Sequence, residues 1–174
     1  MLLRMFQRQI QLQCQAVILA AHEMESALTT GDRTRAWVAI QNLLTAAANI
    51  SKALWGQRAA QRAALRTSLQ VDDTSPLKPV VMRNHFEHFD EKLDDWWRDS
   101  ERHNHVDMSI GPEGMVRGTE EIDMFRQFDP DTGEVMFWSE RFNLQEVVAE
   151  IQRILPIVNA EAEKPHWEPR ITTD

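Results

Sequence analysis

The stretch that decides the fold is residues 3–28, LRMFQRQIQLQCQAVILAAHEMESAL. Its apolar residues recur at alternating spacings of three and four, the period of one side of an α-helix. The members of this stripe are Leu3, Phe6, Ile10, Cys14, Val17, Ala21, Met24 and Leu28. The sequence therefore predicts one long amphipathic helix that ends at Gly31, because glycine commonly terminates helices.

Three further helices are expected before residue 104. A second apolar stripe begins after Asp32 and comprises Trp37, Ile40, Leu44, Ala47, Ile50 and Leu54. Gly56 separates this helix from a shorter one over residues 57–69. Residues 71–79 form a loop, because two prolines there remove backbone donors. The last of the three covers residues 79–103, with a buried side formed by Met82, Phe86, Phe89, Leu93 and Trp96.

Beyond residue 103 the apolar period changes to two, which is the period of a β-strand. Val106, Met108 and Ile110 alternate with polar residues. Strands over 122–128 and 134–139 are expected on either side of Pro130-Asp131-Thr132-Gly133, a sequence that favours a tight turn. Asn143 followed three residues later by Glu146 indicates the start of a final helix.

These elements predict a mainly α fold, an up-and-down helical bundle with a small antiparallel β-hairpin or sheet inserted before the last long helix. We expect a single domain over residues 1–174. Its parts are a helical bundle over 1–103, the β insertion over 104–142, the returning helix over 143–162 and a frayed tail over 163–174. Pro156 is expected to kink or shorten the returning helix.

The composition limits the classes of function. A net charge of −8 argues against broad, sequence-blind attraction to nucleic acid, so any RNA contact must be local. Cys14, the only cysteine, lies on the apolar stripe and is expected to be a core residue rather than a nucleophile. Glutamines interrupt the early apolar residues, which predicts neither a signal peptide nor a membrane span. We expect a cytoplasmic protein.

The polar run Arg83-Asn84-His85-Phe86-Glu87-His88 is the strongest functional signal. It places a guanidinium, a carboxamide and an imidazole within two turns of a helix, and these groups can handle a phosphodiester without a metal. Requiring Asn directly after the Arg reduces the chance expectation of such a run to roughly 0.05 per chain of this composition. On a helix, Asn84 and His88 lie four residues apart on one side that points away from the core.

The Arg-Asn-x-x-x-His pattern resembles the signature of the HEPN superfamily, in which four to six residues separate an Arg from a His and the residue after the Arg is often Asn. The run over residues 83–91 also resembles uncharacterised bacterial proteins of this kind. The resemblance covers these few residues and, more loosely, the helical bundle with its returning helix. It implies a homodimer, and many members are metal-independent endoribonucleases of toxin–antitoxin or defence systems.

The resemblance assigns catalytic roles to three residues. His88 would act as general acid or base on the ribose 2′-hydroxyl or the leaving oxygen. Arg83 would hold the scissile phosphate, and Asn84 would orient a phosphate oxygen or the imidazole. RNA and an antitoxin are the partners implied, with no cofactor, no metal and no membrane. Glu91 and Asp95 follow His88 on the same side, and unneutralised carboxylates there would repel RNA.

Several alternatives remain at this point. Arg83 and Glu87 can simply form an exposed ion pair, and the chain can be a noncatalytic dimeric interaction module that recruits a partner through its Met- and aromatic-rich insertion. His85, His88 and Glu91 suggest a metal site, which the absence of a Glu-x-x-His motif among these residues disfavours. Three arginines at four-residue spacing predict either an RNA-binding track or a charged seam with Asp90 and Asp94. They are Arg58, Arg62 and Arg66.

Overall fold

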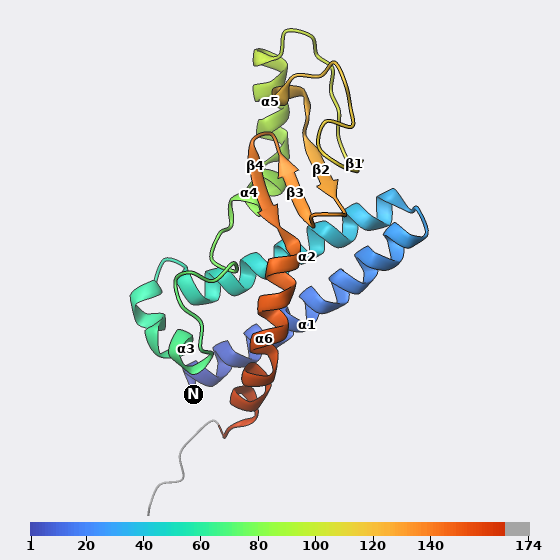
Figure 1. The fold of residues 1–174 in the computed structure, drawn as a ribbon. Coiled ribbons are helices and arrows are strands. Elements are labelled where there is room, and N and C mark those ends of the chain that lie inside the picture. Colours follow the sequence, from blue (N-terminus) through green and yellow to red (C-terminus); the bar gives the residue numbers. More distant parts are fainter. Residues whose placement is uncertain (166–174) are drawn as a thin grey trace, which may run out of the picture.

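The computed structural model describes residues 1–165, and its base is an antiparallel pair of long helices (Figure 1). Helix α1 (Leu2–Thr29) and helix α2 (Arg33–Trp55) are joined by a short turn in which Gly31 has φ +69°. The Asp32 side chain caps α2 by accepting a hydrogen bond from Arg35 N at 3.0 Å. Both helices and both glycine stops, Gly31 and Gly56, agree with the prediction.

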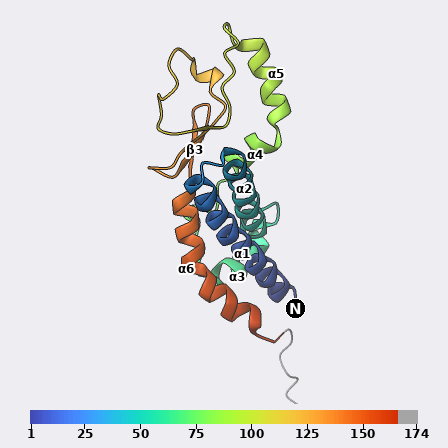
Figure 2. The ribbon, with the colours of Figure 1, turned by 90° about the vertical axis from the view of Figure 1, so that its right-hand side faces the viewer.

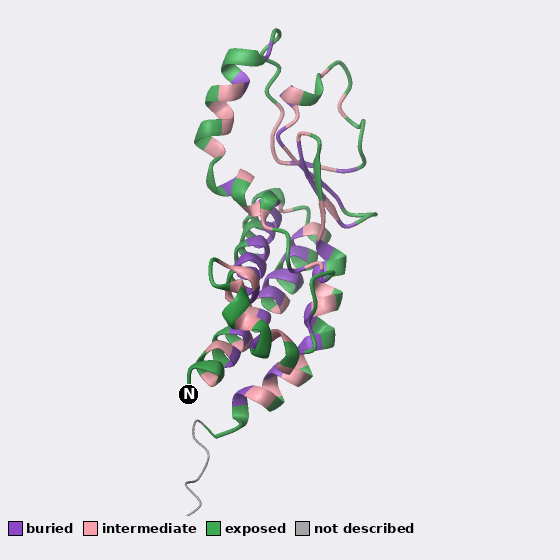
Figure 3. Ribbon diagram, turned by 90° about the vertical axis from the view of Figure 1, so that its left-hand side faces the viewer, coloured by how far each residue is buried: buried purple, intermediate pink, exposed green. Residues whose placement is uncertain are grey.

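Helix α6 (Leu144–Glu163) crosses α1 on the side away from α2, so that α1 lies in the middle of the helical layer (Figures 1 and 2). Asn143 caps it by accepting a hydrogen bond from Glu146 N at 3.0 Å, as predicted. The expectation that Pro156 shortens this helix was wrong, since α6 continues to Glu163. Burial is concentrated where these helices face one another and the sheet (Figure 3).

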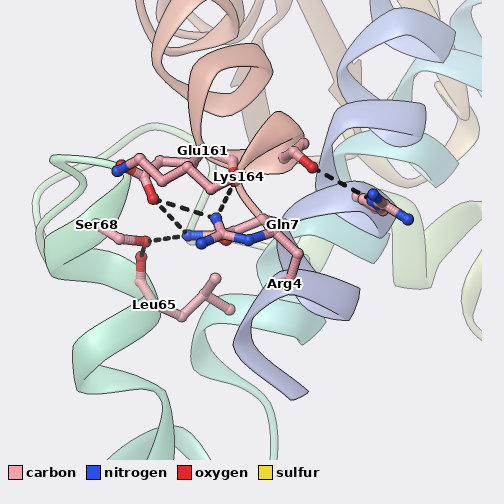
Figure 4. A network of polar contacts seen from close by, with 8 residues as sticks. Arg4, Gln7, Leu65, Ser68, Glu161 and Lys164 are labelled. Carbon is pink, nitrogen blue, oxygen red and sulfur yellow. Dashed lines mark hydrogen bonds and ion pairs between the residues drawn. The ribbon is translucent and has the colours of Figure 1, made fainter. Parts of the chain in front are cut away.

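A polar network ties the start of α1 to the end of α6 (Figure 4). Gln7 is fully buried, and its Nε2 donates to Ser68 Oγ at 2.8 Å and to a Glu161 carboxylate oxygen at 3.3 Å. Arg4 donates to the Gln7 side chain and to the Glu161 backbone carbonyl. Ser68 belongs to α3 (Ala63–Ser68), so this network joins three separate segments of the chain.

The segment predicted as one helix over 57–69 is a 3₁₀ turn, η1 (Ala59–Arg62), followed by the single-turn helix α3. The helix predicted over 79–103 is likewise two helices, α4 (Val81–Glu87) and α5 (Phe89–Asp99), which meet at His88. Helix α4 packs on α2 and the sheet, whereas α5 packs on η2 (Glu121–Asp123) and touches the sheet through Phe89. Their predicted inward residues Met82, Phe86 and Trp96 are buried.

The β insertion is a four-stranded sheet in the order β1-β2-β3-β4. Strand β2 (Arg126–Asp129) pairs antiparallel with β3 (Glu134–Phe137) through the predicted turn, and β3 pairs antiparallel with β4 (Glu140–Asn143). The short strand β1 (Ser109–Ile110) pairs parallel with β2, which makes the sheet mixed. The strand predicted over 122–128 begins only at Arg126, because η2 occupies the preceding residues.

The fold class is confirmed: the described residues are mainly helical, and a small sheet precedes the final long helix. The inner side of the sheet covers one end of the helical layer through Phe128, Val135 and Phe137, which are buried. Helix α5 lies beyond the sheet, at the far end from the N-terminus (Figure 1). Of the tail predicted to be frayed over 163–174, residues 166–174 lie outside the described part of the chain.

Candidate active site

Arg83 and Asn84 lie in contact on the first turn of α4. The Arg83 guanidinium donates a hydrogen bond of 3.0 Å to Asn84 Oδ1 and forms an ion pair with Glu87 one turn later. Its side chain is only 14% exposed, whereas Glu87 is 54% exposed. The ion pair expected under the simpler interpretation is therefore present. It also holds the guanidinium in one orientation.

A small cleft of about 150 Å³ opens beside Arg83. Its walls come from α2 and α4, and they consist of Gln41, Leu44, Thr45, Arg83, Phe86 and Glu87. The cleft was not predicted, because it depends on how α4 docks on α2. It places the edge of the guanidinium next to a recess instead of open solvent, which suits recognition of a group bound there.

His88 occupies the corner between α4 and α5. Its backbone N–H donates to Asn84 O at 2.9 Å and ends α4, while its carbonyl accepts from Lys92 N at 3.2 Å in the first turn of α5. The side chain is 54% exposed, as predicted, and Nδ1 lies 3.4 Å from a Glu91 carboxylate oxygen. A carboxylate at Nδ1 favours the tautomer that carries its proton there, which leaves Nε2 as the acceptor.

The carboxylates that follow His88 are partly neutralised. Asp95 lies 3.6 Å from Lys92 Nζ and 3.1 Å from an Arg98 guanidinium nitrogen. Glu91 faces the His88 imidazole. The repulsion expected between this helix and an RNA backbone is therefore reduced at Asp95, which has two cationic neighbours.

His85 turns away from this site toward the sheet. Its ring stacks on Phe137 with a centroid distance of 5.1 Å, and its Nε2 is buried without a hydrogen-bond partner among the described residues. Desolvation, and then the positive charge of Lys92, lower the pKa of His85, with Glu140 acting in the opposite direction. Within residues 1–165, no group of three His, Cys, Asp or Glu side chains is arranged to hold a metal ion.

Two of the three arginines of the predicted track make separate structural contacts, and Arg58 is exposed. Arg66 donates hydrogen bonds of 2.7 and 2.8 Å to the carbonyls of Leu54 and Ala59, which caps the end of α2. Arg62 lies over the Phe6 ring with its Cζ 4.0 Å from the centroid. The predicted seam with Asp90 and Asp94 was wrong: no ion pair joins these groups in the described residues, and α3 lies near the N-terminus whereas α5 lies at the opposite end of the molecule (Figure 1).

The outer side of the sheet carries a cleft of about 420 Å³. Met124, Met136 and Trp138 contribute apolar surface to it, and Glu113, Glu120 and Arg141 lie among its other walls. The Met- and aromatic-rich composition of the insertion thus serves both sides of the sheet. The inner side packs on the helices, and the outer side lines this cleft.

Comparison with known proteins adds no relative to this description: the chain matches no protein family, no curated protein and no solved structure. Across residues 1–165, no helix combines the length and the apolar character that a membrane crossing requires. The function of the chain must therefore be inferred from the geometry of the site itself.

Proposed function

We propose that this chain is a HEPN-like, dimeric, metal-independent endoribonuclease in which Arg83, Asn84 and His88 act on the phosphodiester. The observation that carries the proposal is the exposed His88 imidazole at the α4–α5 corner, with Glu91 at its Nδ1, on the same segment as the Arg83–Asn84 pair. An RNA substrate and an antitoxin that restrains the activity belong to the same proposal.

The proposed reaction needs no group that the chain lacks. The Nε2 atom of His88 removes the proton from a ribose 2′-hydroxyl, and the 2′-oxygen attacks the adjacent phosphorus. The bond from phosphorus to the 5′-oxygen breaks, and that oxygen takes up a proton. The products are a 2′,3′-cyclic phosphate and a free 5′-hydroxyl. A second His88, from the other copy in a dimer, can supply the proton.

Arg83 retains the donors that this role requires. One guanidinium nitrogen, Nη1, makes both contacts with Asn84 and Glu87. Within residues 1–165, Nε and Nη2 make no hydrogen bond, so two donors remain for a phosphate oxygen. Because Arg83 is already oriented, binding a phosphate costs less side-chain entropy than for a free arginine.

A noncatalytic interaction module is the second candidate, and the Arg83–Glu87 ion pair favours it. A guanidinium held by a neighbouring carboxylate has part of its charge neutralised, and the chain as a whole is acidic. In this alternative the polar side of α4 is a solvated surface, and the protein acts by binding another protein.

The test is cleavage of total cellular RNA by the purified full-length chain with a chelator present. We expect wild type to produce fragments with 2′,3′-cyclic phosphate ends. His88→Ala should reduce the rate by roughly 100-fold or more, because a general acid or base contributes at least that factor. Arg83→Ala should cause a loss of about 100-fold, typical of a group that stabilises transition-state charge.

His22→Ala is the matched control, because His22 is also an exposed histidine but lies on α1, away from the site. It should leave the cleavage rate unchanged. Expression in cells gives a second reading: growth arrest is expected with wild type and with His22→Ala, but not with His88→Ala. Equal inertness of wild type and His88→Ala in both assays would contradict the nuclease and favour the interaction module.

A further inference from the structure

Helix α1 carries a second apolar stripe on its outward side. Leu12 is 56% exposed and Leu19 is 69% exposed, seven residues apart, and Met5 continues the same spacing at 56% exposure. A seven-residue spacing returns to almost the same direction on a helix. The stripe is opposite the buried residues Ile10 and Cys14, so the α1 core does not need it.

Two charged residues of α1 lie symmetrically on either side of Leu12 and Leu19. Arg8 precedes Leu12 by four residues, and Glu23 follows Leu19 by four residues. No Asp, Glu, Lys or Arg lies between Arg8 and Glu23 along the chain. Taking about 100° per residue, both charged residues lie within roughly 40° of the direction of Leu12. The centre of the pattern falls between Gln15 and Ala16.

From this arrangement we infer that a second copy of the chain docks on the outward side of α1, antiparallel to the first, with a twofold axis beside Gln15 and Ala16. A twofold axis there pairs Leu12 with Leu19 of the partner subunit, and Arg8 with Glu23 of the partner subunit. Each contact occurs twice, because a twofold interface is self-complementary. The apolar centre is thereby closed at both ends by opposite charges.

The surroundings of the stripe agree with a helix as the occupant. A shallow groove of about 550 Å³ runs between α1 and α2 beside the stripe, lined by Gln13, Ala16, Leu19, Ala20, Glu23, Asn42, Thr45 and Ala46. The groove offers a recess for apolar side chains of a helix lying against α1. Val38 of α2, which is 55% exposed, adds further apolar surface on the next helix.

The charged groups at the two ends remain able to form intersubunit pairs. Arg8 uses Nε to donate to the Ala162 carbonyl at 3.3 Å, and within residues 1–165 its terminal nitrogens make no hydrogen bond. Glu23 accepts from Arg35 at 2.8 Å through Oε1. Its Oε2 makes no hydrogen bond in the described part of the chain. Each side chain therefore keeps an unused donor or acceptor for the partner.

Sedimentation of the full chain tests the interface. We expect wild type to sediment at about twice 20.2 kDa at a concentration of about 100 µM and to dissociate on dilution. Leu19→Lys should raise the dissociation constant by roughly 100-fold, because it places a charge in the apolar centre. Trp97→Lys is the matched control, since Trp97 is 67% exposed but lies on α5, and it should leave the dissociation constant unchanged.

Charge exchange tests the antiparallel register. Arg8→Glu and Glu23→Arg should each raise the dissociation constant by about tenfold, because each places like charges opposite one another twice in the dimer. The double variant should restore wild-type affinity, and mixing the two single variants should yield the heterodimer. Circular dichroism of each variant at low concentration controls for unfolding, since Glu23→Arg also removes the ion pair with Arg35.

Two outcomes would overturn the inference. If the wild-type protein remains monomeric at about 100 µM, the inferred interface is wrong, and the exposed stripe of α1 binds another protein or a lipid surface instead. A dimer that is insensitive to Leu19→Lys and to charge exchange must form elsewhere. The inference depends on α1 alone, so a dimer without RNA cleavage contradicts the proposed function but not this interface.

Discussion

The indole Nε1 of Trp96 donates a hydrogen bond of 3.0 Å to the carboxylate of Asp123, which is fully buried. The Ser100 hydroxyl donates to the same oxygen at 2.7 Å. This carboxylate therefore joins the end of α5 to η2 and fixes the outer helix on the sheet. A buried carboxylate is tolerated only where donors replace the water that it has lost.

We predict that Asp123→Asn lowers the free energy of unfolding by about 1–3 kcal/mol. An uncharged amide replaces the carboxylate and accepts the hydrogen bonds of its neighbours less well. Denaturation in urea at pH 7 measures the change. Asp131→Asn, on the exposed turn of the hairpin, is the matched control and should change the unfolding free energy by less than about 0.5 kcal/mol. A similar change in both variants would contradict the assigned role.

The same carboxylate gives a pH dependence. Burial acts to raise the pKa of Asp123, but the hydrogen bonds from Ser100 and Trp96 outweigh it, and the pKa lies below its ordinary value. The stabilisation is complete above the unfolded pKa of about 3.9 and is lost as the pH falls through the lower folded pKa. The stability difference between wild type and Asp123→Asn should therefore shrink as the pH falls below about 4.

The parts of the fold that follow from local pattern were predictable. The stripes of α1 and α2, the Asn143 cap and the turn ending at Gly133 each depend on residues a few positions apart. The break at His88 has no such signal, since neither Gly nor Pro is present there. Around it α4 packs on α2 and α5 packs on η2, and these contacts, like the parallel pairing of β1 with β2, are nonlocal.

The candidate site likewise has features that could be predicted from sequence spacing and features that could not. Sequence spacing indicated the outward Asn84 and His88 and the Arg83–Glu87 pair. It could not reveal the cleft beside Arg83, which needs α2, or the turning of His85 onto Phe137, which needs the sheet. The outward Leu12 and Leu19 were not predicted as a surface, although they lie seven residues apart in the sequence. Their exposure became apparent only once the burial of the opposite side was known.

Gln7 should be important for stability although it is polar. Its side chain is fully buried and donates to Ser68 and Glu161 (Figure 4). Gln7→Leu keeps the volume but removes the hydrogen bonds that Gln7 makes with Ser68, Glu161 and Arg4, so we expect a loss of about 1–3 kcal/mol in urea denaturation. Gln152→Leu, at an exposed position on α6, should be nearly neutral. Equal effects of the two substitutions would argue against the network.

Arg66 has a structural role, whereas Arg58 is exposed to solvent. Arg66→Ala removes two hydrogen bonds to the carbonyls of Leu54 and Ala59, and we expect the unfolding free energy to fall by about 1.5–3 kcal/mol. Arg58 is exposed, and Arg58→Ala should change it by less than about 0.5 kcal/mol. If the arginines instead formed an RNA-binding track, both substitutions would weaken RNA binding to a similar extent and leave thermal unfolding unchanged.

Cys14 should be chemically inert in the folded protein. It is fully buried between the helices, and desolvation by burial raises its pKa to about 12. Only the thiolate reacts with a disulfide reagent, so at pH 8 both burial and the raised pKa suppress the reaction. We expect labelling in native buffer to be slower than in denaturant by roughly 100-fold or more, because it requires opening of the helical layer. Rapid labelling of the native protein, with the reaction complete before any unfolding is detectable by circular dichroism, would show that α1 separates readily from α2 and α6.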